Sequence, residues 1–369
     1  MMKIPFFDYP QLYLKDKERL HNILEEVGSR GAFIMQNDLL DFEKSLATFS
    51  NSRFALGVAN GTDALELGLA CVNLKQGDEV IISSHTMIAT ASAIITAGGK
   101  PVPVDIGWDN LIDPDAISSA ITPNTVGIMP THLNGRTCNM DPILKIADKH
   151  NLFIMEDAAQ ALGSTFKGQH AGTFGLASGI SFFPAKVLGC LGDGGGVLTQ
   201  DENIYNKIYQ MRDHGRDQKG EIKCWGRNSR LDNLQAAILF DKLKEYKSDV
   251  VRRRRFIASQ YNDLLSGIEE LSLPPAPDSN IDHFDVYQNY EITAENRDAL
   301  KEFLSANGIG TLVQWGGKAV HQFNFHKWDT ELPKTNEFFR KCIMLPMNMF
   351  ISDSDIEYIC EKITSFYRS

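Results

Sequence analysis

The sequence lacks the short motifs that usually identify a nucleotide or metal site. Its six cysteines include no CxxC pair, and neither GxGxxG nor a P-loop occurs in the 369 residues. Scattered cysteines are typical of reduced thiols in a cytoplasm, so neither a disulfide framework nor a zinc site is expected. A dinucleotide or ATP site has no support either. The chain also contains no internal repeat and no low-complexity tract.

Basic residues are fewer than acidic ones, 37 against 47. The net charge of −10 argues against nucleic acid or an anionic membrane surface as a general partner. The apolar run before the first acid is too short for a signal peptide. Residues 80–99 are uncharged and long enough to cross a bilayer, but they carry a histidine, several hydroxyl groups and a glycine pair. We interpret them as buried core and expect a cytoplasmic protein without a membrane segment.

The apolar runs indicate the fold class. A chain of this length with 43% hydrophobic residues can bury a large core and can form two domains. Residues 79–83, 101–105, 126–131 and 152–156 read as strands, separated by connections of helical length. This rhythm predicts an α/β fold with a mostly parallel, buried sheet. Residues 161–198 have shorter runs and glycine-rich turns, which predicts hairpins.

The C-terminal third has a different pattern. Residues 229–260 read as a long helix that includes the arginines 252–255, which we interpret as a solvated face making salt bridges. The proline-rich segment 274–277 marks a boundary. A smaller α+β segment follows, and it closes with a helix whose N-cap is Ser352. The predicted domains are residues 1–250, with an N-terminal helical segment, and residues 251–369.

Three predicted strands end in polar clusters, at residues 83–86, 131–136 and 156–160. In an open parallel sheet, ligands bind beyond the carboxyl ends of the strands, so these clusters are candidates for one site. An acid at the end of a buried strand, such as Asp157, is costly unless a partner compensates it. Asp157 could cap the next segment or face a protonated ring nitrogen, and both roles stay open at this point.

One lysine stands out among uncharged neighbours. An apolar run stops at Pro184, Lys186 follows, and a glycine-rich turn comes next. Desolvation favours a neutral, nucleophilic amine, which is what a Schiff base requires. The alternative is a lysine whose head simply reaches water beside a loop. The glycines of residues 192–196 precede a predicted strand rather than a helix, so a tight turn fits them better than a phosphate loop.

Two further features have competing interpretations. Gly61, Thr62 and Asp63 open a predicted helix, whose N-terminus attracts phosphate, although a capped helix with Thr62 as N-cap needs the same residues. His321 and His326 could bind a metal, but no acidic or cysteine partner stands at ligand spacing. No metal is therefore expected.

Taken together, the chain resembles the sugar aminotransferases of the DegT/DnrJ/EryC1/StrS family, which are pyridoxal-phosphate enzymes of the aspartate-aminotransferase fold (fold type I). This resemblance implies a three-layer fold with a mostly parallel mixed central sheet and a smaller C-terminal α+β domain. It covers nearly the whole chain and is weaker after residue 270. The motifs, in order, are GTDALELGL (61–69), SHTMIATASAI (84–94), PTHLNGRTCNMDPI (130–143), IMEDAAQALGSTFKG (154–168), AGTFG (171–175), SFFPAKVLGCLGDGGGVLT (181–199) and GRNSRLDNLQAAIL (226–239).

The resemblance assigns roles to individual residues. Lys186 matches the lysine of SF[FY]PxK and would hold pyridoxal 5′-phosphate as a Schiff base, while Asp157 of EDAAQ would keep the pyridine nitrogen protonated. Relatives with histidine instead of this lysine are dehydratases, so Lys186 implies a transaminase. The other cofactor contacts implied are Gln160 near the ring's 3-hydroxyl, Gly61, Thr62 and Ser181 at the phosphate, and Asn228 reaching across from the partner subunit of a homodimer with shared sites.

Some positions depart from the family pattern. Where most relatives stack an aromatic residue on the pyridine ring, this chain has Met87, whose thioether can pack on a ring face. His85 is the alternative residue for that place, and it is also a candidate substrate residue. Toward the C-terminus, His321 would keep the family role of a histidine near the sugar, and Trp315 and Lys318 are expected to line the nucleotide or sugar pocket.

The implied reaction transfers an amino group from L-glutamate to a nucleotide-linked keto sugar. The sugar would be a dTDP- or UDP-4-keto-6-deoxyhexose or its 3-keto isomer, and the product would serve O-antigen, capsule or another surface glycan. One alternative is a transaminase of a non-nucleotide keto sugar. Another is a non-catalytic, cofactor-binding regulatory protein, against which the presence of both Lys186 and Asp157 argues.

Overall fold

The computed structural model describes residues 3–328 and 330–368, and its centre is a seven-stranded sheet. The strand order is β1-β9-β8-β5-β4-β2-β3. The strands β3, β2, β4, β5 and β8 are parallel to one another. Strand β9 is antiparallel to both of its neighbours, β8 and β1. The strands are β1 (Phe54–Val58), β2 (Glu79–Ser83), β3 (Lys100–Val104), β4 (Thr125–Met129), β5 (Phe153–Asp157), β8 (Ala177–Ser181) and β9 (Gly195–Thr199).

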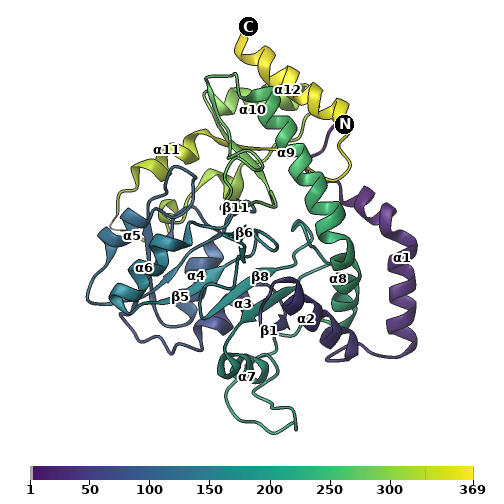
Figure 1. Ribbon diagram of the computed structural model, residues 1–369, viewed down its shortest axis with the longest axis vertical. Helices are drawn as coiled ribbons and strands as arrows, with labels where there is room; N and C mark the ends of the chain where they lie inside the picture. The colour runs from purple at the N-terminus through teal and green to yellow at the C-terminus, as the bar shows by residue number, and fades with distance from the viewer. Residues whose placement is uncertain (1–2, 329, 369) are drawn as a thin grey trace.

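Neighbouring residues of each central strand bury their side chains in different cores. Ile81 and Ile154 belong to a core shared with α5 and α6, while Ile82 and Met155 belong to a core shared with α3, α4 and α7. Because side chains alternate between the faces of a strand, the sheet lies between two helical layers, as predicted (Figure 1). The helices of this region are α1 (Tyr9–Ser29), α2 (Asn37–Phe49), α3 (Gly61–Leu69), α4 (Ile88–Thr96), α5 (Pro114–Ala120), α6 (Met140–His150), α7 (Glu202–Met211) and α8 (Asn233–Glu245).

The four predicted strands are present and differ from the prediction only at their ends. Residues 161–198 contain the predicted hairpins, namely β6 (Thr165–Phe166) with β7 (Gln169–His170), and β8 with β9. The sequence reading missed β1, which pairs with the distant β9. The prediction of Thr62 as the N-cap of α3 was also wrong, because the side chain of Asn60 accepts the N–H of Asp63 at 2.8 Å.

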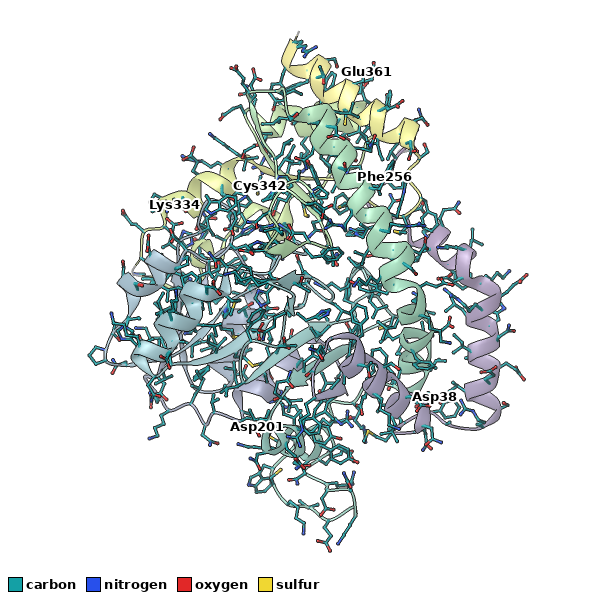
Figure 2. The ribbon with its side chains drawn as sticks, viewed as in Figure 1. Asp38, Asp201, Phe256, Lys334, Cys342 and Glu361 are labelled. Atoms are coloured by element: carbon teal, nitrogen blue, oxygen red, sulfur yellow. The ribbon has the colours of Figure 1, made fainter. Side chains whose placement is uncertain are left out.

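A smaller unit lies at the C-terminal end of the chain, where α12 (Asp353–Arg368) forms the tip in Figure 1. Ser352 and Asp355 form the predicted capping pair, since each backbone N–H donates to the other's side chain. Cys360 lies on the buried face of α12, whereas Glu361, labelled in Figure 2, is exposed. The remaining elements here are β10 (Leu271–Ser272), β12 (Tyr290–Ala294) and β13 (Cys342–Leu345) in one sheet, β11 (His283–Phe284) beside β6, and α9 (Arg252–Leu265), α10 (Arg297–Ala306) and α11 (Pro333–Lys341).

The helix that joins the two parts is continuous in space but irregular. A π-helical turn, Tyr246–Val251, links α8 to α9, so the predicted domain limit at residue 250 falls inside a helix and stays a prediction. Turns of this π-helical kind occur frequently at functional sites.

The N-terminal Ile4 packs into the C-terminal core and forms a bridge with Ile309.

The interpretation of arginines 252–255 as a solvated face with salt bridges was wrong for Arg254. Its guanidinium donates to three backbone carbonyls, those of Tyr287, Gln288 and Met347, at 2.6 to 2.9 Å. Burial lowers the pKa of Arg254 to about 10. A sequence cannot reveal such a partner set, because all three carbonyls come from segments that only the fold brings to α9.

No helix within residues 3–328 and 330–368 is long and apolar enough to cross a membrane. The uncharged stretch 80–99 divides between β2, α4 and the turns that follow them. Residues 80–86 are buried, whereas α4 buries one face, with Ile94 fully buried and Ile95 57% exposed. The interpretation of the whole stretch as buried core was therefore right for β2 and only half right for α4.

Candidate active site

The polar clusters at the strand ends meet, as the parallel sheet predicts. Asp157 ends β5, and its carboxylate Oδ2 accepts a hydrogen bond from Thr90 Oγ1 at 2.7 Å. Hydroxyl contacts then connect Thr90 to Thr86 (2.7 Å) and Thr86 to Thr131 (2.8 Å). The backbone N–H of Ala159 donates to Oδ1 at 3.1 Å. The three threonines were not predicted as site residues, although Thr86 and Thr131 belong to the polar clusters themselves.

Asp157 is buried, with 3% of its surface exposed. A buried carboxylate with only two neutral hydrogen-bond donors is poorly compensated, so it stabilises a nearby positive charge. The charge of Asp157 acts on Lys186, whose pKa it raises against the larger opposing effect of burial. The two side chains are therefore close enough for their charges to interact.

Lys186 lies in the loop between β8 and β9 and is half-buried. Burial lowers the pKa of its amino group to about 8. In the described parts of the chain, Nζ has no hydrogen-bond or ion-pair partner, which sets Lys186 apart from Lys242, a neighbour that donates to the Gly189 carbonyl at 2.9 Å. The alternative interpretation, in which the Lys186 amino group reaches open water, does not fit this burial.

The pKa of Lys186 gives a first testable expectation. If the neutral amine reacts, the rate at which cofactor-free protein binds pyridoxal phosphate covalently should rise by about tenfold between pH 7 and 9 and then level off. The neutral fraction grows over this window because burial has moved the pKa down to about 8. Stopped-flow absorbance measures the rate, and Lys242→Met is the control that should keep the profile. A rate still rising near pH 10 would contradict the assignment.

A second group of residues surrounds a helix N-terminus. Gly61 is the first residue of α3, and a Cβ on it would lie 2.9 Å from Cβ of Ser181. Gly195 packs against Asn60, the residue before Gly61, since a Cβ on Gly195 would lie 2.3 Å from the Asn60 carbonyl oxygen. Gly61 therefore packs against Ser181, with Thr62 next in the chain, and part of the glycine run serves this close approach rather than the turn alone.

The sequence did not predict a site role for residues 287–289, where Arg254 binds the carbonyls of Tyr287 and Gln288. Gln288 accepts the N–H of Val187 at 2.8 Å and donates to the carbonyl of Ala185 at 2.9 Å, so it holds the backbone on both sides of Lys186. Asn289 contacts Gln160, with its Nδ2 3.3 Å from Oε1. No motif in the sequence distinguishes these amides from ordinary surface residues.

Met87 and His85 lie in different surroundings. Met87 is 46% exposed and directly precedes α4, three residues before Thr90. His85 is 1% exposed, and its Nδ1 lies 2.8 Å from the carbonyl oxygen of Asn110, so Nδ1 carries the hydrogen. The His85 ring packs against Phe338, with 4.5 Å between ring centroids. Met87 is thus the more accessible of the two for a ring face, and its role stays a prediction.

Three of the four predicted substrate residues lie on one loop, 313–321, whereas the fourth, His85, lies between β2 and α4. Trp315 is half-buried, 5.7 Å from His85 between ring centroids, and Lys318 is exposed. His321 is held at both nitrogens, by Ser84 Oγ at 2.6 Å and Asn336 Oδ1 at 2.9 Å, and burial lowers its pKa. Within the described residues, no group of three or more potential metal ligands occurs.

Asn228 is exposed on the loop that projects beyond α7 in Figure 1. The same loop carries Trp225, which is 97% exposed, and Ile222, which is 72% exposed. Large exposed apolar side chains on a projecting loop are typical of a surface that another protein covers. The predicted contribution of Asn228 to a partner's site requires such an assembly.

Comparison with known proteins identifies this arrangement. A model of the DegT/DnrJ/EryC1/StrS aminotransferase family matches residues 14–364. The chain belongs to this family. It is a transaminase that uses pyridoxal 5′-phosphate, so the predicted class of enzyme and cofactor are confirmed.

Several relatives of this aminotransferase are similar over their whole length. The dTDP-3-amino-3,4,6-trideoxy-alpha-D-glucose transaminase of Streptomyces venezuelae is 35% identical, over 94% of this chain and 91% of the relative. The UDP-2-acetamido-2-deoxy-3-oxo-D-glucuronate aminotransferase of Pseudomonas aeruginosa is 32% identical, over 98% and 100%. A protein of Geobacillus stearothermophilus named pleiotropic regulatory protein is 35% identical, over 100% and 99%.

Solved structures confirm the type I fold. DesV of S. venezuelae superimposes with a TM-score of 0.95 at 32% identity, with both chains covered completely. NtdA of Bacillus subtilis, solved with the cofactor PMP bound, has a TM-score of 0.91 at 29% identity, over 100% of this chain and 86% of NtdA.

The residues of this aminotransferase fit pyridoxal phosphate. Three features match the cofactor's aldehyde, ring nitrogen and phosphate in turn. They are a half-buried lysine that has no partner among the residues the structure describes, a buried carboxylate, and a helix N-terminus beside hydroxyl groups. The cradle is narrow, because Gly61 and Gly195 leave no room for a side chain. A pocket beside Lys186 is lined by Tyr9, Arg254, Asn289 and Met347.

Proposed function

We propose that this aminotransferase moves an amino group from L-glutamate to a nucleotide-linked keto sugar, with the keto group at C3 of a dTDP- or UDP-hexose. The observation that carries the proposal is the full-length similarity to transaminases whose names specify nitrogen or oxygen at C3 of a nucleotide sugar. Their similarity includes the region of the candidate site. A role in surface-glycan biosynthesis in the cytoplasm is part of this proposal.

The residues divide the chemistry among themselves. When bound, pyridoxal phosphate supplies a ring that accepts negative charge from the substrate carbon. Asp157 would keep a proton on the ring nitrogen, and Gly61, Thr62 and Ser181 would bind the phosphate through N–H and hydroxyl groups. Lys186 would hold the cofactor through its amino group, and the same amino group, when free, would serve as base and acid for the proton of the substrate carbon. Its pKa of about 8 suits both directions near neutral pH.

We further propose a homodimer in which Asn228 of one subunit reaches the phosphate in the other. The exposed Trp225 and Ile222 on the same loop support this assembly. His321, Trp315 and Lys318 are proposed to contact the sugar or its nucleotide from the loop 313–321. Met87 is proposed to cover the ring face. The two predicted domains, 1–250 and 251–369, would meet at this site.

The substrate is tested with a panel of nucleotide keto sugars. The glutamate-treated enzyme is mixed with dTDP- and UDP-linked 3-keto and 4-keto hexoses and with a non-nucleotide 3-keto sugar phosphate. We expect amination of a 3-keto nucleotide sugar with a kcat/KM at least about 100-fold above that of the 4-keto isomers, because a carbonyl displaced by one carbon cannot reach the reacting atoms. NMR of the product locates the nitrogen. A preference for the sugar phosphate would instead support the non-nucleotide alternative.

The regulatory alternative has one observation in its favour, which is the name of the Geobacillus relative. A protein that only binds the cofactor needs no proton-transferring amine and no charged partner for the ring nitrogen. Lys186 and Asp157 provide both, which supports catalysis. Absence of any glutamate-dependent change in the cofactor's absorbance would favour regulation.

A further inference from the structure

Gln160 is held by a row of amide groups that ends at a buried carboxylate of the small unit. Its Oε1 accepts the backbone N–H of Asn134 at 2.9 Å and the side-chain Nδ2 of Asn289 at 3.3 Å. The same Nδ2 donates to Asn134 Oδ1 at 2.8 Å, and Asn134 Nδ2 donates to Glu291 Oε2 at 2.6 Å. Asn289 and Glu291 are 9% and 4% exposed, so water competes little with this row.

The row fixes the orientation of the Gln160 amide. A backbone N–H can only donate, so the Gln160 atom that faces Asn134 must be the oxygen. The NH2 group on the other end of the planar amide is therefore turned away from Asn134 and Asn289. Within residues 3–328 and 330–368 this NH2 group has no acceptor, which leaves both of its hydrogens for a ligand.

Glu291 fixes the same orientation from the opposite end. A carboxylate in this position accepts hydrogen bonds, so Asn134 must present Nδ2 to Glu291 and Oδ1 to Asn289. The titratable group that faces Glu291 is His85, whose Nε2 lies 3.4 Å from Oε2. Asn289 must then present its NH2 group to both oxygens, one of which belongs to Gln160. Every amide in the row thus has one permitted orientation.

The backbone reinforces the row. Gly135 follows Asn134 with a φ of +88°, and a Cβ there would lie 2.5 Å from the backbone nitrogens of Tyr287 and Gln288. The N–H of Val286 donates to the carbonyl of Gly135 at 2.9 Å. The loop after β4 therefore packs backbone to backbone against the segment 286–291. This contact fixes the position of Asn134 relative to Asn289.

The row also reaches the predicted sugar-binding loop. Gln314 Nε2 donates to Asn134 Oδ1 and to Glu291 Oε2, both at 2.9 Å, and Gln314 directly precedes Trp315. Gln314 is 4% exposed. The amide orientation at Gln160 is thus connected to the loop 313–321 by hydrogen bonds between buried groups.

We propose that Asn289 and Glu291 are positioning residues that lock the Gln160 amide with its NH2 group toward the ring oxygen of the cofactor. This inference rests on the proposed cofactor role of Gln160. A donor aimed at that oxygen stabilises its negative charge and weakens its hold on the proton that it shares with the nitrogen bound to Lys186. Loss of the lock should raise the pH at which this proton leaves.

The test is a pH titration of the absorbance of the bound cofactor, without substrate. Gln160→Leu, which removes the donor, should raise the midpoint by about one unit, and Asn289→Leu by about 0.5–1 unit. Because Asn289 acts through Gln160, adding Asn289→Leu to Gln160→Leu should change the midpoint by no more than about 0.2 unit.

Glu291 provides a matched pair of variants. In Glu291→Gln the amide oxygen can still accept from Asn134 and Gln314, and its NH2 group takes the place of Oε1, which has no partner within the described residues. This variant should keep the wild-type midpoint, whereas Glu291→Leu should raise it. A circular dichroism spectrum and melting curve of each variant check that it is folded, and Asn289→Ser replaces Asn289→Leu if the latter is not.

Three results would overturn the proposal: an unchanged midpoint in the folded Asn289 variant, an equal shift by that variant with and without Gln160, or equal midpoints for the two Glu291 variants. Failure of the proposed function looks different. An enzyme that rejects every keto sugar but shows these midpoints would refute the substrate and leave the positioning role standing. A wild-type protein that binds no cofactor would refute both.

Discussion

Lys186→Ala is expected to abolish conversion of the bound cofactor by glutamate, with a rate at least about 10⁴-fold below wild type, since covalent attachment and proton transfer are lost together. The basis is the half-buried amine with a pKa of about 8 and no partner within the described residues. Stopped-flow absorbance with glutamate measures the rate. Borohydride reduction followed by peptide mass spectrometry should place the cofactor on Lys186 in the wild type and on no lysine in the variant.

Lys242→Met is the matched control for this prediction. Burial lowers the pKa of Lys242 as well, but its Nζ donates to the Gly189 carbonyl of the loop that carries Lys186. Its loss should lower the melting temperature and leave the glutamate half-reaction within about threefold of wild type. A Lys186→Ala variant that still reacts with glutamate at the wild-type rate would refute the mechanism.

Asp157→Asn is the second large expected effect. The exchange removes the negative charge but keeps the contacts, because the new amide can accept from Ala159 N–H and donate to the Thr90 hydroxyl. We expect a folded protein whose glutamate half-reaction is slower by about 10²–10³-fold, as for loss of one preorganised charge partner. In the cofactor-free variant, the pKa of Lys186 should fall below 8, because Asp157 raises it in the wild type.

The neighbouring acid offers the contrast. Glu156 is fully buried and accepts N–H groups of Gly172, Phe174 and Gly175, and it faces His132 Nε2 at 2.8 Å. Glu156→Gln would turn an NH2 group toward one of these donors and should cost about 1–3 kcal/mol of stability, measured by denaturant unfolding. Its effect on the half-reaction should be much smaller. Equal rates for Asp157→Asn and wild type would show that the ring nitrogen needs no charged partner.

The two acids show how far a sequence can be read. Both lie in one motif, and the sequence alone left Asp157 between a capping and a catalytic role. The resemblance of the sequence to the DegT/DnrJ/EryC1/StrS family suggested the catalytic role of Asp157. That Glu156 organises the loop 172–175 instead follows only from the fold, because its partners are backbone N–H groups that carry no sequence signal.

The sequence determined the four parallel strands 79–83, 101–105, 126–131 and 152–156 to within two residues at their ends, the burial of residues 80–86, and the polar strand ends that meet at Asp157. These follow from local periodicity and from the geometry of a parallel sheet. Only the tertiary structure decided that Arg254 is buried under backbone carbonyls, that Gln288 holds the backbone around Lys186, and that Asn289 contacts Gln160. The reason is physical: these amides and this guanidinium find their partners more than 25 residues away in the chain, where no local pattern can record them.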